Sequence, residues 1–219
     1  MIRILSVVLV FITINLPSLS QDVKKWEETI LQFEKRDVGN PVKKNGVVFA
    51  GSSSVVMWKT LEEDFKGINV INRGFGGSCI SDLVYYVDRV ILVYKPSQVF
   101  IYSGENDIAF GAAPEEVLND FKILVKRIQE KLPACRIHYI SIKPSPSRRI
   151  YQEDFRKANF LIESFIKNQN NPKLKFINVF DAMLDDIGRP RPALFIADSL
   201  HMNQDGYKIW KGIVGSYLK

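Results

Sequence analysis

Four short segments of this 219-residue chain carry side chains that together suit the transfer of an acyl group. In chain order they are Gly51-Ser52-Ser53-Ser54, Asn72-Arg73-Gly74-Phe75-Gly76-Gly77, Gly104-Glu105-Asn106-Asp107 and Asp198-Ser199-Leu200-His201. They offer a serine hydroxyl, glycine amides, an asparagine amide, and a carboxylate three residues before a histidine. Acyl transfer requires a nucleophile, a base, a group that orients the base, and donors for the developing oxyanion. The combination predicts an ester-hydrolysing site.

Each segment also has a plainer structural explanation. Serine is a favoured helix cap, glycines form turns, and asparagine and aspartate are common turn residues. Asp-x-x-His arises often by chance, but only two histidines occur, and His138 lies within an expected strand, where a packed structural role is favoured. The glycine segments match neither a phosphate-binding loop nor the dinucleotide fingerprint. The four segments taken together therefore favour catalysis.

The elements that must position these segments alternate between short apolar runs and longer amphipathic stretches. Strands are expected at residues 47–50, 68–72, 98–103, 136–142 and 175–179. Helices are expected at residues 21–38, 54–65, 81–93, 114–132, 151–168 and 204–218. Apolar strands that alternate with helices indicate an α/β protein whose parallel sheet is covered on both faces.

Three of the candidate residues follow closely on expected strand ends. Ser53, Gly77 and Asn106 each lie within five residues of the end of such a strand. In open α/β sheets, ligands bind outside the carboxyl ends of the strands. We therefore expect these residues to converge at one edge of the sheet.

Length, composition and charge indicate one globular domain over residues 21–219. Hydrophobic residues make up 46% and charged residues 25%, which is typical of globular proteins. The formal net charge of +6 comes from basic residues scattered among nearly as many acids. A nucleic-acid-binding protein would concentrate its positive charge on one stripe or arm. No nucleic-acid partner is expected.

Residues 1–20 have the pattern of a secretory signal peptide. Arg3 supplies a positive charge, residues 4–16 are largely apolar, and Ser18-Leu19-Ser20 offers small residues for cleavage before Gln21. The apolar stretch is shorter than the roughly 20 residues that span a bilayer. We expect a secreted or periplasmic protein with no stable membrane anchor after cleavage; the alternative is an uncleaved N-terminal anchor.

Cys79 and Cys135 are expected to be free. Cys79 follows the end of one expected strand and Cys135 precedes the start of another, which places them on the order of 15–20 Å apart. Disulfide Cα atoms lie within about 7 Å. Two dissimilar histidines and two separated cysteines make no zinc site, and no other metal or cofactor is expected.

With these segments, the chain resembles the SGNH hydrolases, also called GDSL-type esterases, over its whole mature length. The resemblance implies a flavodoxin-like three-layer α/β/α sandwich with a five-stranded parallel sheet. It assigns the nucleophile to Ser53 and one oxyanion donor to Gly77, with the adjacent Gly76 as an alternative. The family's usual aspartate before the nucleophile is Ser52 here, and alignment from Gly51 selects Ser53 among the three serines.

The same resemblance assigns the remaining roles in the reaction. His201 removes the Ser53 proton as the serine attacks an ester carbonyl, and Asp198 stabilises the resulting imidazolium. The Asn106 side chain, together with the backbone N–H groups of Ser53 and Gly77, holds the tetrahedral oxyanion. Water then releases the acyl group.

The substrate is the part that the sequence determines least. Arg148 and Arg149 follow the fourth expected strand at the catalytic edge, where they can bind an anionic group or simply face solvent. The lack of a long lid insertion favours small or short-chain acyl esters, such as O-acetyl groups on carbohydrate. Two alternatives stay open: a lysophospholipase or thioesterase for longer acyl chains, and a non-catalytic carbohydrate-binding protein that retains the fold.

Overall fold

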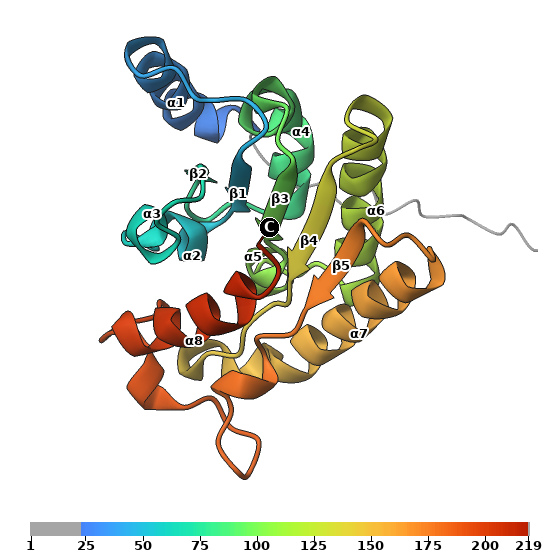
Figure 1. Cartoon of the computed structure of the whole chain (residues 1–219). Coiled ribbons are helices and arrows are strands. Elements are labelled where there is room, and N and C mark those ends of the chain that lie inside the picture. Colours follow the sequence, from blue (N-terminus) through green and yellow to red (C-terminus); the bar gives the residue numbers. More distant parts are fainter. Residues whose placement is uncertain (1–22, 219) are drawn as a thin grey trace, which may run out of the picture.

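The five expected strands form one parallel sheet in the order β2-β1-β3-β4-β5. The computed structural model describes residues 23–218 (Figure 1). The strands are β1 (Val47–Gly51), β2 (Val70–Gly74), β3 (Gln98–Tyr102), β4 (Arg136–Ile140) and β5 (Leu174–Ile177). This order is that of the flavodoxin-like doubly wound fold, which confirms the predicted α/β/α architecture.

Helices cover both faces of the sheet. The α-helices are α1 (Glu27–Gly39), α2 (Ser53–Val56), α3 (Leu61–Asp64), α4 (Ile80–Val90), α5 (Glu105–Ala109), α6 (Pro114–Lys131), α7 (Gln152–Asn168) and α8 (Gln204–Gly215). Short 3-10 turns are η1 (Val23–Trp26), η2 (Leu92–Tyr94), η3 (Pro146–Tyr151), η4 (Asp181–Met183) and η5 (Pro192–Leu194). Helices α1, α4, α6 and α7 pack on one face, whereas α2, α3 and α8 pack on the other.

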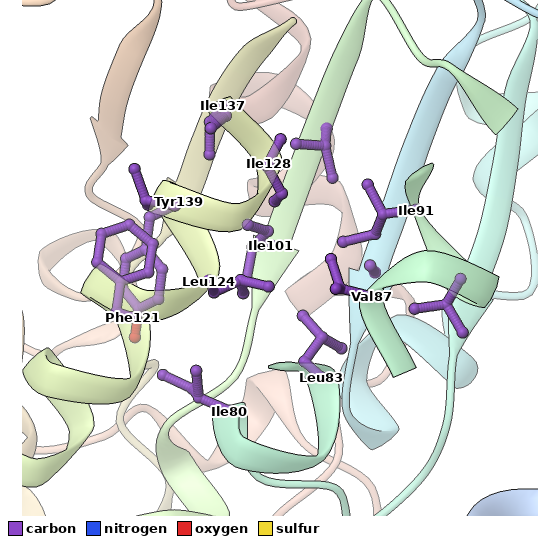
Figure 2. Packing of buried hydrophobic residues seen from close by; sticks show 14 of the residues in the cluster. Ile80, Leu83, Val87, Ile91, Ile101, Phe121, Leu124, Ile128, Ile137 and Tyr139 are labelled. Carbon is purple, nitrogen blue, oxygen red and sulfur yellow. The ribbon is translucent and has the colours of Figure 1, made fainter. Parts of the chain in front are cut away.

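The central strands are apolar on both sides because both faces are covered. On β3, Val99 and Ile101 belong to the core beneath α4 and α6, whereas Phe100 and Tyr102 belong to the core beneath α2, α3 and α8. Figure 2 shows Ile101 between side chains of α4 and α6. The sheet is thus packed on both faces, and the loops that follow its strands begin from fixed positions at its carboxyl edge.

The expected helix over residues 54–65 is broken into α2 and α3. Between them the Trp58 side chain is buried, with its ring 5.7 Å from that of Phe49. The Trp58 Nε1 donates a hydrogen bond of 2.8 Å to Asp64 Oδ2. Burial of this large ring and its polar nitrogen favours a turn over a continuous helix. As a result, α2 is one short turn that ends soon after Ser53.

Two further expectations need correction. The sequence pattern predicts one apolar face of the first helix, formed by Trp26, Ile30, Leu31 and Phe33. In the structure Leu31 is 46% exposed, whereas Ile30 and Phe33 are buried. The apolar stripe is therefore narrower than expected. Residues 105–109 were expected to form a loop and instead form helix α5, whose first turn carries Asn106.

Cys79 and Cys135 are both buried and are not joined in a disulfide, as predicted. Within residues 23–218, no helix combines the length and the apolar character needed to cross a membrane. In the same range, no group of three or more His, Cys, Asp or Glu side chains is arranged to hold a metal ion. The signal peptide predicted for residues 1–20 lies outside the described residues.

Candidate active site

Ser53 is placed at the carboxyl edge of the sheet by a glycine that no other residue can replace. Gly51 ends β1 with φ +145°, and a Cβ atom there would lie 1.9 Å from the carbonyl oxygen of Tyr102. The next residue, Ser52, donates its backbone N–H to that oxygen at 3.0 Å. The chain therefore runs tightly against β3 before it turns into α2, and Ser53 is the first residue of that helix.

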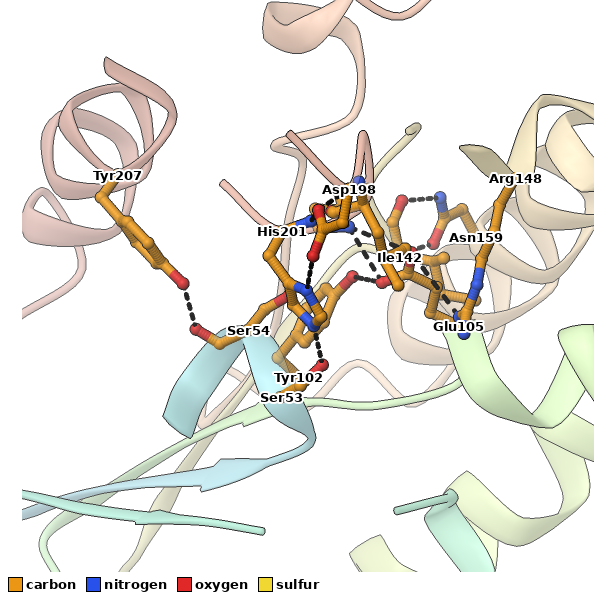
Figure 3. Close-up of polar contacts among 12 residues, drawn as sticks. Ser53, Ser54, Tyr102, Glu105, Ile142, Arg148, Asn159, Asp198, His201 and Tyr207 are labelled. Atoms are coloured by element: carbon orange, nitrogen blue, oxygen red, sulfur yellow. Dashed lines mark hydrogen bonds and ion pairs between the residues drawn. The ribbon is translucent and has the colours of Figure 1, made fainter. Parts of the chain in front are cut away.

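Ser53, His201 and Asp198 form a continuous hydrogen-bonded chain (Figure 3). His201 Nε2 lies 2.9 Å from Ser53 Oγ, and His201 Nδ1 lies 2.6 Å from Asp198 Oδ2. Ser52 and Ser54 are buried, so Ser53 is the one of the three serines that contacts this histidine. The structure thus brings together three predicted residues that the sequence separates by up to 148 positions.

The turn that carries Asp198 and His201 is held by the aspartate itself. Asp198 Oδ1 accepts the backbone N–H groups of Leu200 and His201, each at 2.9 Å. Ser199 between them adopts φ +56°, a left-handed conformation that is uncommon for residues other than glycine. This conformation lets the aspartate fold back onto the histidine ring three residues later.

Protonation at this turn suits base catalysis. Partial burial acts to raise the pKa of Asp198, but hydrogen bonds from the His201 ring and from two backbone N–H groups hold that pKa at about 2. The carboxylate is therefore ionised and accepts a hydrogen bond from Nδ1–H, which assigns the hydrogen of a neutral His201 to that nitrogen. Nε2 then presents its lone pair to the Ser53 hydroxyl, an arrangement that can remove the serine proton.

Asn106 reaches the same edge from helix α5. Its Nδ2 donates to the carbonyl oxygen of Ser78 at 2.9 Å. An amide nitrogen carries two N–H groups, so Asn106 can donate to Ser78 and to a second acceptor at the same time. Helix α5 begins directly after Gly104, where φ is +113° and a Cβ atom would lie 2.9 Å from Ile142 Cδ1.

The two candidate glycines have different neighbours. A Cβ atom built on Gly76 would lie 3.7 Å from Ser53 Cβ, in ordinary contact. A Cβ atom built on Gly77 would instead lie 3.3 Å from Trp26 Cη2. The Cβ direction of Gly76 therefore faces Ser53, and that of Gly77 faces Trp26, the residue that precedes α1.

The two candidate substrate-binding arginines differ in their surroundings. The Arg148 side chain is 16% exposed, and its Nη1 lies 3.7 Å from Glu105 Oε1. Arg149 is exposed in the same turn, η3. The other histidine, His138, stacks on Phe100 with ring centroids 4.4 Å apart, as expected for a packed structural residue.

A buried ion pair at this edge was not anticipated. Lys143 is fully buried, and its Nζ lies 3.0 and 3.1 Å from the two carboxylate oxygens of Glu105. One signal in the sequence could have found it. Glu105 and Lys143 both follow expected strands, and topology brings the carboxyl ends of neighbouring strands together.

A cleft of about 650 Å³ is lined by residues close in sequence to Ser53 and His201, but by neither of these two residues. Its lining includes Met57, Ile196, Met202 and Tyr207. Met57 closes helix α2 by donating its backbone N–H to Ser53 O at 2.8 Å, and Met202 directly follows His201. The cleft therefore adjoins both segments that carry the candidate nucleophile and base.

Comparison with known proteins points to one family. A model of the GDSL-like lipase/acylhydrolase family matches residues 46–209. Among curated proteins, none matches the chain.

Solved structures share the fold at low sequence identity. A Streptococcus pneumonia protein provisionally described as a platelet activating factor has a TM-score of 0.78 and 23% identity, over 90% of this chain and 94% of its own. A GDSL-like lipase from Bacteroides thetaiotaomicron has a TM-score of 0.72 and 19% identity, over 86% and 96%. A family 3 carbohydrate esterase from Clostridium thermocellum has a TM-score of 0.65 and 17% identity, over 79% and 94%.

Proposed function

The chain belongs to the GDSL-like lipase/acylhydrolase family and hydrolyses ester bonds, and on this premise we propose that it is a serine esterase whose acyl-enzyme forms on Ser53. The observation that carries the proposal is the hydrogen-bonded chain from Ser53 through His201 to Asp198, with distances of 2.9 and 2.6 Å. A nucleophile, a base and an orienting carboxylate are the groups that acyl transfer requires.

The reaction proceeds in two halves. Ser53 Oγ forms a bond to the ester carbonyl carbon while its proton passes to His201 Nε2, and the imidazolium is stabilised by Asp198. Collapse of the tetrahedral intermediate breaks the bond to the alcohol oxygen, which leaves with the proton from His201. A water molecule then gives its proton to His201 and attacks the acyl carbon. Collapse of this second intermediate breaks the bond to Ser53 Oγ, which takes the proton back from His201, and the carboxylic acid is released.

The oxyanion of each tetrahedral intermediate is held by three donors. We assign them to the Asn106 side chain and the backbone N–H groups of Ser53 and Gly77, with the adjacent Gly76 as the alternative. Fixed donors aimed at developing charge stabilise the transition state without reorganisation.

We propose small or short-chain acyl groups as substrates, including O-acetyl groups on carbohydrate. The His201 and Asp198 side chains are 19% and 44% exposed, so the reacting edge is open to a large alcohol portion. The carbohydrate esterase that shares the fold supports the same class. Arg149, exposed beside the site, is then the arginine available to an anionic substrate group, because Arg148 lies near the Glu105 carboxylate.

The cleft favours a second candidate, hydrolysis of longer acyl chains. Met57, Ile196 and Met202 give it an apolar part that can hold an alkyl chain, and charged side chains line the rest of it: Lys59, Asp64, Lys208 and Lys211. Rates with p-nitrophenyl acetate, butyrate and octanoate separate the two candidates. If the cleft binds the acyl chain, Ile196→Trp lowers octanoate turnover at least about tenfold more than acetate turnover, because a large side chain fills a pocket that acetate does not reach. For a short-chain esterase, acetate is the better substrate and the variant leaves the ratio unchanged.

Covalent labelling tests the nucleophile. A fluorophosphonate should give one adduct per chain, and peptide mapping should locate it on Ser53. His201→Ala should abolish labelling, because the serine then loses its base. An adduct on Ser52 or Ser54, or esterase activity that survives full labelling, would overturn the assignment.

We also propose that the protein is exported to the periplasm or the medium by the leader in residues 1–20. Expression of the full chain in a bacterial host, followed by N-terminal sequencing of the purified protein, tests this. A mature protein that begins at Gln21 supports export, and a retained Met1 in a membrane fraction would indicate the uncleaved anchor.

A further inference from the structure

A buried ion pair between Lys143 and Glu105 connects the turn that carries His201 to helix α5, which carries Asn106. The side chains of Lys143 and Glu105 are 0% and 5% exposed. Glu105 also accepts a hydrogen bond of 2.5 Å from the hydroxyl of Tyr102, and the Arg148 guanidinium lies 3.7 Å away. The carboxylate is thus held from β3, from Lys143 after β4, and from turn η3.

The third contact of Lys143 reaches the histidine turn. Its Nζ donates to the carbonyl oxygen of Leu200 at 2.9 Å. Leu200 directly precedes His201, and it follows Ser199, whose left-handed φ of +56° is uncommon outside glycine. A second hydrogen bond, from the Ser147 backbone N–H to Ser199 O at 3.0 Å, holds the same turn from outside. An uncommon conformation persists where the surrounding structure fixes it.

The backbone that carries Lys143 is itself fixed. The Asn159 side chain from α7 accepts the backbone N–H of Ile142 at 2.8 Å and donates to its carbonyl at 2.9 Å. Lys143 follows at once, so its stem leaves a rigid segment. At the other end of the pair, Glu105 is the first residue of α5 and is followed by Asn106.

Stability alone does not account for this arrangement. Removing two charges from water costs more than their attraction returns unless every remaining hydrogen-bonding group is satisfied, and apolar replacements are often as stable. Burial lowers the pKa of the Lys143 ammonium, and the Glu105 carboxylate opposes that effect. What apolar side chains cannot provide is the hydrogen bond to Leu200.

We propose that Lys143, anchored by Glu105, is a positioning residue that fixes the His201 turn relative to the Asn106 donor. This rests on the proposed function, because only a reacting Ser53–His201 pair requires such alignment. A displacement of the order of 1 Å in a catalytic group can cost about 100-fold in rate. Loss of the Lys143 contact to Leu200 should therefore lower kcat roughly 10- to 100-fold and leave KM within about threefold.

The test compares three variants with the wild-type protein on p-nitrophenyl acetate, with Tm measured for each. Lys143→Met removes the contact to Leu200 and leaves the Glu105 charge buried. Lys143→Met/Glu105→Gln removes both charges. Gln98→Leu is the matched control, because Gln98 is a fully buried polar residue at the opposite end of β3 that donates to Tyr217 O at 2.9 Å.

If Lys143 has a positioning role, the variants should change kcat and Tm independently of each other. We expect Lys143→Met to lower both Tm and kcat, and the double variant to regain Tm without regaining kcat. Gln98→Leu should lower Tm and keep the wild-type kcat. If the single variant does not fold, the double variant alone decides. Recovery of kcat together with Tm in the double variant, or a folded Lys143→Met with kcat within twofold of wild type, would overturn the proposal.

Failure of the proposed function would look different. Ser53→Ala would then keep wild-type turnover, and the positioning role would fall with it. If Ser53→Ala is inactive while the folded lysine variants keep their kcat, only the positioning role is wrong.

Discussion

Replacing Asp198 by asparagine should harm the reaction more than replacing it by alanine. Asp198 Oδ1 accepts two backbone N–H groups at 2.9 Å, from Leu200 and His201. In Asp198→Asn the amide oxygen must take that position, because the NH₂ group would oppose two donors. The NH₂ group then faces His201 Nδ1, 2.6 Å from the original Oδ2 position.

This orientation forces the histidine into the unproductive tautomer. Nδ1 must accept a hydrogen bond from the new amide, so the ring proton moves to Nε2 and points at Ser53 Oγ. The base then has no lone pair for the serine proton. In a well-studied serine protease, the equivalent change lowers kcat by about 10⁴-fold, and we expect a similar loss here.

In Asp198→Ala no neighbouring amide determines which ring nitrogen of His201 carries the hydrogen. The Asp198 side chain is 44% exposed, so water can accept the Nδ1 proton in Asp198→Ala. Asp198→Ala loses the charge-assisted hydrogen bond to the ring, worth about 1.5–3 kcal/mol, and also the two backbone hydrogen bonds that Oδ1 accepts from Leu200 and His201. We therefore expect kcat to fall about 10³-fold, which is still a smaller loss than in Asp198→Asn.

The assay is kcat for p-nitrophenyl acetate between about pH 6 and pH 9, with circular dichroism to establish that both variants are folded. Because the pKa of Asp198 is about 2, the carboxylate of the wild-type protein is ionised throughout this range and adds no limb to the pH profile. Equal rates for the two variants, or a more active asparagine variant, would refute the tautomer argument.

Three further predictions concern the Asn106 segment. Asn106→Ala should lower kcat about 100- to 1,000-fold at a similar KM, and a kinetic loss below tenfold would exclude it as an oxyanion donor. Burial raises the pKa of Asp107 from 3.8 to about 6, although the Ile80 N–H opposes this. The folded protein therefore holds this proton more tightly than the unfolded chain does, and it loses stability as pH rises from about 4 to 6. The Tm of Asp107→Asn should not show that decline. Parallel plots of Tm against pH for the wild type and the variant would contradict the prediction. Gly104→Ala adds a Cβ atom 2.9 Å from Ile142 Cδ1 at a residue whose φ is +113°. The free energy of unfolding in urea should therefore fall by about 1–3 kcal/mol. An unchanged unfolding midpoint would contradict this prediction of strain.

The architecture was predictable because the strands are short, apolar and separated by amphipathic helices. That pattern places the ends of parallel strands at one edge, so the convergence of Ser53 and Asn106 followed from topology. The sequence pattern does not contain the break between α2 and α3, because it depends on where the Trp58 ring packs in the core. A helical period in residues 54–65 cannot reveal a tertiary contact of that kind.

The sequence predicts the reacting residues of the site, but it does not predict the buried residues that hold them in position. Nucleophile, base and acid candidates stand in recognisable segments, whereas Lys143 stands in a Lys-Pro-Ser-Pro stretch that is typical of a solvated loop. Its burial depends on a partner 38 residues away. Adjacent Gly76 and Gly77 are equivalent in a sequence pattern, although different side chains lie beside them in the fold.

The central claim is that Ser53 is the nucleophile, and the most direct test is the turnover of p-nitrophenyl acetate by the mature protein and by Ser53→Ala. The hydroxyl lies 2.9 Å from His201 Nε2, and alanine removes it without adding bulk. We predict that kcat falls about 10⁵-fold or more in a variant that melts at the wild-type temperature. Equal turnover by the two proteins would contradict the account.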